Sequence, residues 1–212
     1  MVIFQVLLVV LQFAASLFFY SSLPHLIPIH WNIMGNVDNY MVKQYAVWMM
    51  PLINVLMLAS FKLAPHFDPK REKYHLFATE WQILQTIFIT FFAYLQGIIF
   101  YISLHPGVGM MKPLFIGLGI FFILLGNYLS KIRQNYFIGI KVPWTLDNED
   151  NWNKTHRFAS WTFVLLGIVV LKEGFLMWNA APVIFSSIIL AATLPIVYSY
   201  RLFRKSKKII RS

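Results

Sequence analysis

The sequence predicts an all-α integral membrane protein in which six transmembrane helices are joined by short polar connections. Of its 212 residues, 58% are hydrophobic and only 12% are charged, unlike the average soluble domain. A hydrocarbon core about 30 Å thick needs about 20 apolar residues per helix, and six runs approach that length. Because backbone groups in lipid must bond to one another, each run is expected to be helical. The runs are residues 1–22, 45–63, 82–104, 113–130, 158–178 and 182–200.

The first run is expected to remain in the protein as a helix. A cleavable signal peptide has basic residues before a short apolar core, whereas here Met1 leads directly into Val2 and Ile3. The chain also contains no cysteine, which excludes disulfides, thiolate nucleophiles and cysteine-bound metals.

The first connection is expected to fold as a short extracytoplasmic cap. It reads LPHLIPIHWNIMGNVDNY over residues 23–40, and its apolar residues alternate with Pro28 and His30, which predicts one extended segment ending at Asn32. Gly35 and Asn36 belong to the turn that follows. Candidate binding residues in the cap are Pro24, Pro28, His30, Trp31, Asn32, Gly35 and Asp38. The alternative is a loop that only returns the chain to the membrane.

No metal and no cofactor is expected. The cap holds two histidines and an aspartate, but their spacing matches no familiar metal site.

The second connection, residues 64–81, mixes charges of both signs, as on a solvated surface. The third connection, residues 105–112, is rich in glycine and proline and is expected to be a tight external loop.

The fourth connection, RQNYFIGIKVPWTLDNEDNWNKTHR over residues 133–157, concentrates side chains suited to recognition. Residues 137–142 alternate and are expected to be extended, and Gly139 permits a close backbone approach. Asp147 is expected to cap a helix that enters the membrane as the fifth span. On that helix Trp152 and His156 share one face, while Asn151 is expected to meet water or headgroups.

Two interpretations of residues 133–157 are open. The first is a binding site at the cytoplasmic membrane surface, and the second is ordinary interfacial architecture of caps, aromatic rings and snorkelling bases. The candidate site residues are Arg133, Asn135, Gly139, Lys141, Pro143, Trp144, Thr145, Trp152, Thr155, His156 and Arg157. No nucleophile stands beside a base, so recognition is expected here and enzyme activity is not.

The fifth span is interrupted by Lys172 and Glu173. Only fourteen apolar-run residues separate them from the start of the run at Phe158, or about 21 Å of helix at about 1.5 Å per residue. The pair is therefore either in the outer headgroup region, which we favour, or buried and functional.

The positions of the 18 Lys and Arg residues predict the orientation, because cytoplasmic loops retain basic residues. Fifteen lie around the second connection, the fourth connection and the carboxyl-terminal tail, whereas Lys43, Lys112 and Lys172 lie near the others. Both termini are thus expected in the cytoplasm.

The net charge of +10 does not indicate nucleic-acid binding, since no soluble domain is present to carry such a surface. The basic tail is instead expected to contact anionic membrane lipid.

These features divide the chain into four sequence units. Residues 1–64 form an amino-terminal two-helix unit with the extracytoplasmic motif at 23–44, and residues 65–112 hold the charged cytoplasmic loop and the third helix. Residues 113–200 form a unit with the cytoplasmic motif at 131–157, and residues 201–212 form the basic tail.

The two polar motifs together resemble the SdpI family of bacterial integral-membrane immunity proteins, over nearly the whole chain. The family signature looks like RQNYFIG at residues 133–139, PWTL at 143–146, Trp152, and KTHR at 154–157. The pattern LPxxIPIHWN at residues 23–32, followed by Gly35 and Asp38, resembles the small domain that often precedes this signature.

The sequence departs from the family pattern at a few positions. Gln134 stands where family members often have proline, and Ala159 and Ser160 stand where glycine is frequent. Lys141 and Val142 stand where arginine and threonine are common. Lysine keeps the charge of arginine but loses its bidentate fork, which weakens the case for a phosphate or carboxylate partner at Lys141.

The resemblance implies a multi-pass protein of the bacterial plasma membrane that protects the cell against a secreted antimicrobial peptide or toxin. One mechanism is toxin binding from outside through residues 23–40 and the membrane-facing helices. A second is a signalling receptor whose cytoplasmic segment docks a transcriptional regulator, with Trp144 or Trp152 as the anchor. A third is a small transporter or efflux protein, for which Lys172 and Glu173 are the hint.

Overall fold

The structure is a computed structural model that describes residues 1–178 and 180–209. It confirms the predicted fold, because six of its helices are long and apolar enough to cross a membrane. The chain is therefore a multi-pass membrane protein. The six helices are α1 (Val2–Phe19), α2 (Lys43–Phe67), α3 (Ala78–Leu104), α4 (Met111–Leu129), α6 (Glu149–Leu176) and α7 (Ala180–Ile209).

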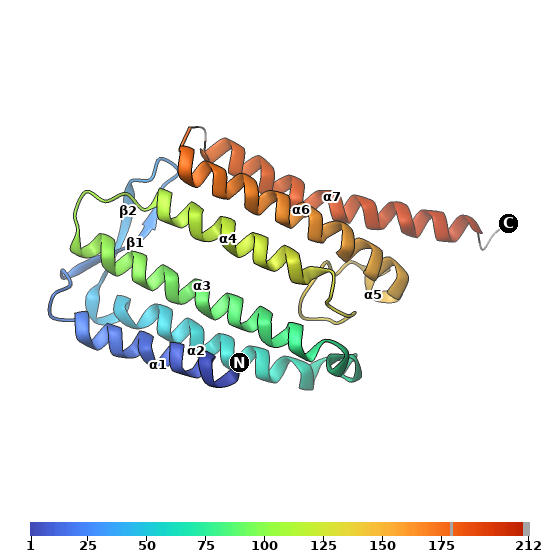
Figure 1. Cartoon of the computed structure of the whole chain (residues 1–212), viewed down its shortest axis with the longest axis horizontal. Coiled ribbons are helices and arrows are strands. Elements are labelled where there is room, and N and C mark those ends of the chain that lie inside the picture. Colours follow the sequence, from blue (N-terminus) through green and yellow to red (C-terminus); the bar gives the residue numbers. More distant parts are fainter. Residues whose placement is uncertain (179, 210–212) are drawn as a thin grey trace.

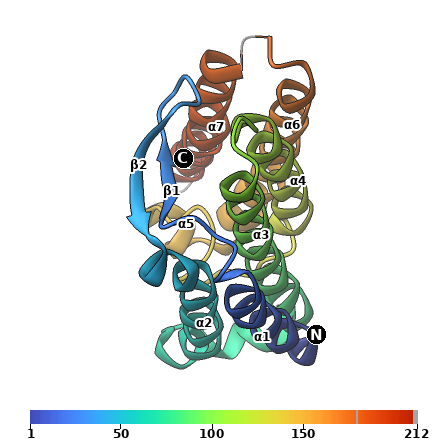
Figure 2. The same cartoon turned by 90° about the vertical axis from the view of Figure 1, so that its left-hand side faces the viewer.

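The six helices run along a common direction and form two groups. Figure 2 shows α1, α2 and α3 on one side and α4, α6 and α7 on the other. One end of the helices carries a β-hairpin, and we call it the hairpin end. The opposite end carries the short helices η1 (Arg71–Phe77) and α5 (Pro143–Asp147) together with residues 131–142, and we call it the loop end (Figure 1). The two sequence motifs thus lie at opposite ends of the helices.

The hairpin adds a small sheet that the all-α prediction lacked. Strand β1 (Leu26–Trp31) confirms the predicted extended segment, and it pairs antiparallel with β2 (Val37–Val42), which was not predicted. Gly35 in the turn has φ +84°, a conformation that favours glycine. Ile27 is buried in a cluster with Ala46 and Val47 of α2, so the hairpin is fixed to the helices.

Helices α4 and α6 approach each other closely because glycines face across their contact. A Cβ placed on Gly119 lies 2.6 Å from the backbone nitrogen of Leu171, and one on Gly167 lies 2.6 Å from the carbonyl oxygen of Gly119. Ser160 Oγ donates a hydrogen bond of 2.6 Å to the carbonyl oxygen of Gly126. Small residues and interhelical hydrogen bonds are the usual means of helix association in lipid, where apolar surface alone gives no preference for protein.

Several predicted boundaries at the loop end are wrong. Residues 137–139 form bends and residues 140–142 have no regular secondary structure, so no strand runs through residues 137–142, and the proline at 143 opens the short helix α5. The cap of α6 is Asn148 rather than Asp147, with Asn148 Oδ1 accepting from the Asn151 nitrogen at 2.8 Å. Helix α6 therefore begins at Glu149 and has 28 residues, about 42 Å at about 1.5 Å per residue, which is ample to cross the bilayer.

Helix α6 extends past Lys172 and Glu173, so neither residue ends the helix. Both lie in the last two turns of the helix at the hairpin end, where Lys172 is exposed and Glu173 is 7% exposed. The interfacial position of the pair stays a prediction, because the apolar stretch of α6 from Phe158 to Leu171 is only about 21 Å long.

Candidate functional site

The loop of residues 131–142 is organised by the buried side chain of Asn135. Its Nδ2 donates to the carbonyl oxygens of Arg133 and Ile138 at 2.8 and 3.1 Å. Its Oδ1 accepts from the backbone nitrogens of Phe137 and Ile138, both at 2.8 Å. Asn135 is fully buried, so its amide fixes the loop from inside and is not offered to a ligand.

His156 and Trp152 on α6 form the wall on which this loop rests. The two rings stack with centroids 3.9 Å apart, and His156 Nε2 accepts from the backbone nitrogen of Ile140 at 3.0 Å. With Nδ1 at 2.9 Å from the Trp152 carbonyl oxygen, the proton belongs on Nδ1. Gly139 has φ +122°, and a Cβ there would lie 3.0 Å from the Trp152 ring. The predicted close backbone approach is confirmed.

Helix α5 is tied to the loop through Thr145 and Gln134. Thr145 Oγ1 lies 2.7 Å from the carbonyl oxygen of Ile140 and 2.9 Å from that of Val142, and it accepts from the Val142 nitrogen at 3.1 Å. Gln134 Nε2 donates to the carbonyl oxygens of Thr145 and Leu146 at 2.7 and 2.9 Å. From the sequence, Gln134 is only a departure from the family pattern. In the structure its side chain joins the loop to α5.

Helix α7 is held against the motif by two hydrogen bonds to Ser199 and by a ring contact. Trp144 Nε1 donates to Ser199 Oγ at 2.8 Å, and its ring stacks on Phe203 with centroids 5.7 Å apart. Asn151 Nδ2 donates to the Ser199 carbonyl oxygen at 3.0 Å, and Thr155 Oγ1 donates to Asn151 Oδ1 at 3.0 Å. Asn151 is 5% exposed, so the prediction that it meets water or headgroups is wrong.

The second connection, interpreted from the sequence as a solvated surface, is part of the same assembly. Asp68 is 3% exposed and its carboxylate accepts from Tyr74 Oη at 2.8 Å, from the Tyr136 nitrogen at 2.9 Å and from the Lys70 nitrogen at 2.7 Å. These partners are up to 68 positions apart in the chain, and no local pattern signals such a contact.

Two lysines extend this link between the connections. Lys70 Nζ donates to the Leu146 carbonyl oxygen at 2.9 Å and to Gln134 Oε1. Partial burial lowers the pKa of Lys70, and the neighbouring charge of Lys73 lowers it further. Lys73 itself forms an ion pair of 2.6 Å with Glu149 at the first turn of α6.

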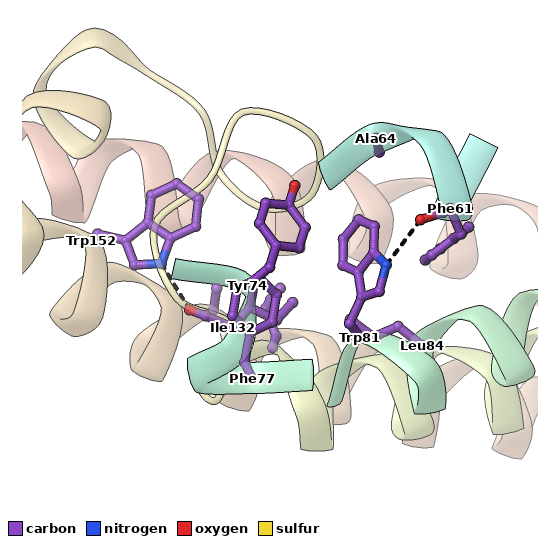
Figure 3. Close-up of a cluster of buried hydrophobic side chains, with 10 residues drawn as sticks. Phe61, Ala64, Tyr74, Phe77, Trp81, Leu84, Ile132 and Trp152 are labelled. Carbon is purple, nitrogen blue, oxygen red and sulfur yellow. Dashed lines mark hydrogen bonds between the residues drawn. The ribbon is translucent and has the colours of Figure 1, made fainter. Parts of the chain in front are cut away.

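A cluster of large apolar side chains lies beneath these polar links. Figure 3 shows Tyr74, Phe77 and Trp81 packed between the end of α2 and the start of α6. The indole nitrogens in this region are paired, Trp152 with the Ile132 carbonyl oxygen at 2.9 Å and Trp81 with that of Phe61 at 3.1 Å. The loop end is therefore a packed structural layer that joins both helix groups.

The exposed part of the predicted loop-end site is basic. Arg133, Lys141 and Arg157 are exposed, as is Pro143, and Lys141 Nζ donates to the Phe137 carbonyl oxygen at 3.0 Å. The buried candidates are Asn135, Thr145, Trp152, Thr155 and His156, with Gly139 and Trp144 half-buried. The two tryptophans suggested as anchors for a regulator are thus already engaged within the chain.

The hairpin-end candidates divide in the same way. His30 Nδ1 lies 2.5 Å from Asp38 Oδ1 across the two strands, and both side chains are exposed, as is Pro24. Asn32 Oδ1 instead accepts from the turn nitrogens of Met34 and Asn36 at 2.9 and 3.1 Å. The remaining three support the cap: Pro28 is buried, Trp31 packs on a buried cluster and Gly35 lies close to Met111.

Comparisons with known proteins match both motifs. The model of the SdpI/YfhL protein family matches residues 131–199, and that of a domain of unknown function, DUF1648, matches residues 7–55. The immunity protein SdpI of Bacillus subtilis (strain 168) is 29% identical over 205 residues, covering 96% of each chain. Residues 131–199 thus resemble the SdpI/YfhL family, and nearly the whole chain is similar to an immunity protein named SdpI. No solved structure matches it.

The family matches correspond to the two ends of the structure. The SdpI/YfhL match begins in the loop of residues 131–142 and runs through α5, α6 and most of α7, so it includes every loop-end candidate. The other match covers most of α1, the hairpin and the first half of α2. Within residues 1–178 and 180–209, no group of three or more His, Cys, Asp or Glu side chains is arranged to hold a metal ion.

Proposed function

We propose that this protein is a membrane immunity protein that protects a bacterial cell against a secreted antimicrobial peptide or toxin. The observation that carries this proposal is the 29% identity to the immunity protein SdpI of Bacillus subtilis across 96% of both chains. Such end-to-end similarity includes both motifs and all six spans. The similarity therefore supports a function of the whole protein and not of one segment alone.

In the proposed orientation the hairpin end faces outward and the loop end faces the cytoplasm. The loop end carries the exposed basic side chains of the second and fourth connections, and α7 continues beyond the other helices there (Figure 1). The exposed cations on that extension include Arg201, Arg204 and Lys205. This charge bias favours the cytoplasm and contact with anionic lipid headgroups.

The proposed mechanism is recognition without catalysis. A secreted peptide reaches the hairpin end first, where the exposed His30 and Asp38 pair offers polar contacts. The imidazole of His156, the best candidate for acid–base chemistry in the family motif, is fully buried and bonded to Ile140 and Trp152. Its role is to support the loop, which argues against an enzyme.

Expression of the chain in a bacterium sensitive to membrane-active peptides tests the proposal. Cells carrying the chain are challenged with a panel of secreted peptides and compared with cells carrying an empty vector. We expect survival against at least one peptide of the panel, and equal killing by every peptide would contradict the proposed function. A variant with His30→Ala and Asp38→Ala, matched for membrane level, separates the hairpin's contribution from that of the helices.

A further inference from the structure

The sheet at the hairpin end has only two strands, so each strand has one edge without a neighbouring strand. Strand β1 lies toward the helices, because Ile27 is buried in a cluster with residues of α2. Strand β2 lies on the outer side of β1 (Figure 2). Its residues Asp38, Asn39 and Tyr40 are exposed, so the outer side of β2 is accessible.

The pairing of the two strands shows which backbone groups face the free edge of β2. In an antiparallel pair, residues that exchange hydrogen bonds alternate with residues whose N–H and C=O point away from the partner. The Lys43 nitrogen donates to the carbonyl oxygen of His25 at 2.9 Å, and the register from there to Pro28 is regular. Val42 and Tyr40, one and three residues before that bond, are therefore the non-bonded positions. The N–H and C=O of Tyr40 and the N–H of Val42 face the free edge.

The two edges of the sheet differ in their ability to pair with another strand. Pro28, the partner of Tyr40 on β1, has no backbone N–H, and proline is one of the residues by which proteins block an edge. Strand β2 reads VDNYMV and contains neither proline nor lysine. Among residues 1–178 and 180–209, no backbone hydrogen bond joins Tyr40 to a residue outside the hairpin. The edge of β2 thus offers the donors and acceptors that an added strand uses.

The charge of the hairpin indicates which extended chain fits this edge. Asp38 is the one Lys, Arg, Asp or Glu residue between positions 23 and 42, and 42% of its side chain is exposed beside His30. A strand that carries Lys or Arg would gain an opposite-charge contact at Asp38. A second copy of this chain would bring a second Asp38 and no basic residue from its own hairpin, so it fits less well.

We propose that the free edge of β2 binds an extended segment of the secreted peptide as a third strand, with a Lys or Arg side chain of that segment beside Asp38. The inference rests on the proposed function and deepens it by naming the conformation and charge of the partner. Backbone hydrogen bonds supply affinity in this kind of recognition, and side chains supply selectivity. In the proposed orientation, the edge lies at the end of the molecule that a secreted peptide reaches first.

Binding of three synthetic peptides to the whole protein in phosphatidylcholine nanodiscs tests this inference, because nanodiscs leave both ends of the protein accessible. The first peptide is a dye-labelled strand of about nine residues in which Thr and Val alternate around one central Lys. The second is the same peptide with N-methyl groups on two adjacent central amides, which blocks both of its edges. The third has Glu in place of Lys. Fluorescence anisotropy gives the affinity of each peptide.

We expect the N-methylated peptide to bind about tenfold more weakly than the Lys peptide, because it lacks backbone hydrogen bonds. The Glu peptide should bind about threefold more weakly, because it places a like charge beside Asp38. Tyr40→Pro removes the outward N–H, leaves the bonded pairs of the hairpin intact and should abolish the effect of N-methylation. Tyr40→Thr keeps that N–H and should preserve the effect. Where Tyr40→Pro does not reach the membrane, Asp38→Lys is measured and should reverse the order of the Lys and Glu peptides.

Equal binding of the Lys peptide and its N-methylated form, or an N-methyl effect that survives Tyr40→Pro, would overturn the inference. An unchanged order of the Lys and Glu peptides in Asp38→Lys would do the same. A native dimer in detergent that Tyr40→Pro converts into a monomer would assign the edge to a second copy of this chain and would also overturn it.

Failure of this binding assay is distinguishable from failure of the proposed function. The assay reads peptide binding in nanodiscs, so a negative result leaves the survival of cells expressing the native chain untouched. Conversely, an absence of protection in cells would overturn the immunity function, while binding in nanodiscs would stand as a property of the β2 edge.

Discussion

Asn135 holds the loop of residues 131–142 with both ends of its amide. Asn135→Ala would leave the partly buried backbone nitrogens of Phe137 and Ile138 without an acceptor, and each such loss costs about 1–2 kcal/mol. We expect the free energy of unfolding to fall by about 2–4 kcal/mol, measured from unfolding in mild detergent. Asn153→Ala, at a half-buried position on α6, is the control and should change stability by less than about 1 kcal/mol.

Substitution of His156 distinguishes a structural role of this side chain from a direct chemical role. His156→Ala removes the acceptor for the Ile140 nitrogen and the ring stacked on Trp152, so stability should fall by about 2–4 kcal/mol and protection should fall with it. His66→Ala, at an exposed position of the loop end, should change neither quantity. Lost protection at unchanged stability and membrane level would show that His156 acts directly on a ligand.

For the residues of the loop-end motif, the sequence indicated that they matter to the protein but not which groups they contact. The motif at residues 133–157 was recognised, yet its polar side chains mostly bond to backbone groups of the same loop or to Ser199 on α7. Asp68 and Gln134 were missed as members because their partners are remote in sequence. Side-chain hydrogen bonds between distant loops leave no periodic trace, unlike the apolar faces of helices.

Helices α4 and α6 depend on glycine for their contact. Gly119→Ala places a methyl group 2.6 Å from the backbone of Leu171, and overpacking of this kind costs about 1–3 kcal/mol. We expect a lower melting temperature in detergent for this variant. Gly97→Ala is the matched control, because the same methyl group meets open space and should leave the melting temperature unchanged or raise it. Equal losses in the two variants would contradict the close α4–α6 packing.

Among the elements, the six spans were predictable because length and hydrophobicity decide them in lipid. Strand β2 was not, since residues 37–42 form a strand through pairing with β1 and the preference for strand depends on such context. The start of α6 was predicted to within one residue, because capping and acidic residues mark it ahead of the apolar run, although the cap is Asn148 and not Asp147. Helix α6 therefore begins several residues before its apolar run, which starts at Phe158.

For the molecule as a whole, the orientation can be read by cysteine labelling, since the chain contains no cysteine. A single cysteine at Asn36, in the hairpin turn, should react in intact cells with a membrane-impermeant maleimide. A single cysteine at Lys141, at the loop end, should react only after the cells are broken. Both positions are exposed, so accessibility within the protein is matched. The reverse pattern would place the loop end outside and overturn the proposed orientation.

The two helix groups are joined at both ends, by the hairpin at one and by Asp68, Lys70 and Lys73 at the other. This arrangement makes the family motif a structural layer at the loop end. In the proposed orientation, that layer lies across the membrane from an arriving secreted peptide and holds the helices that carry the outer surface.

The membrane potential of peptide-challenged cells tests the central claim most directly. Sensitive cells expressing the chain, or carrying an empty vector, are loaded with a potential-sensitive dye and exposed to each peptide of the panel. We expect vector cells to depolarise, while cells with the chain retain their potential against at least one of those peptides. Depolarisation of both cell populations to the same extent by every active peptide, with the chain present in the membrane, would contradict an immunity function.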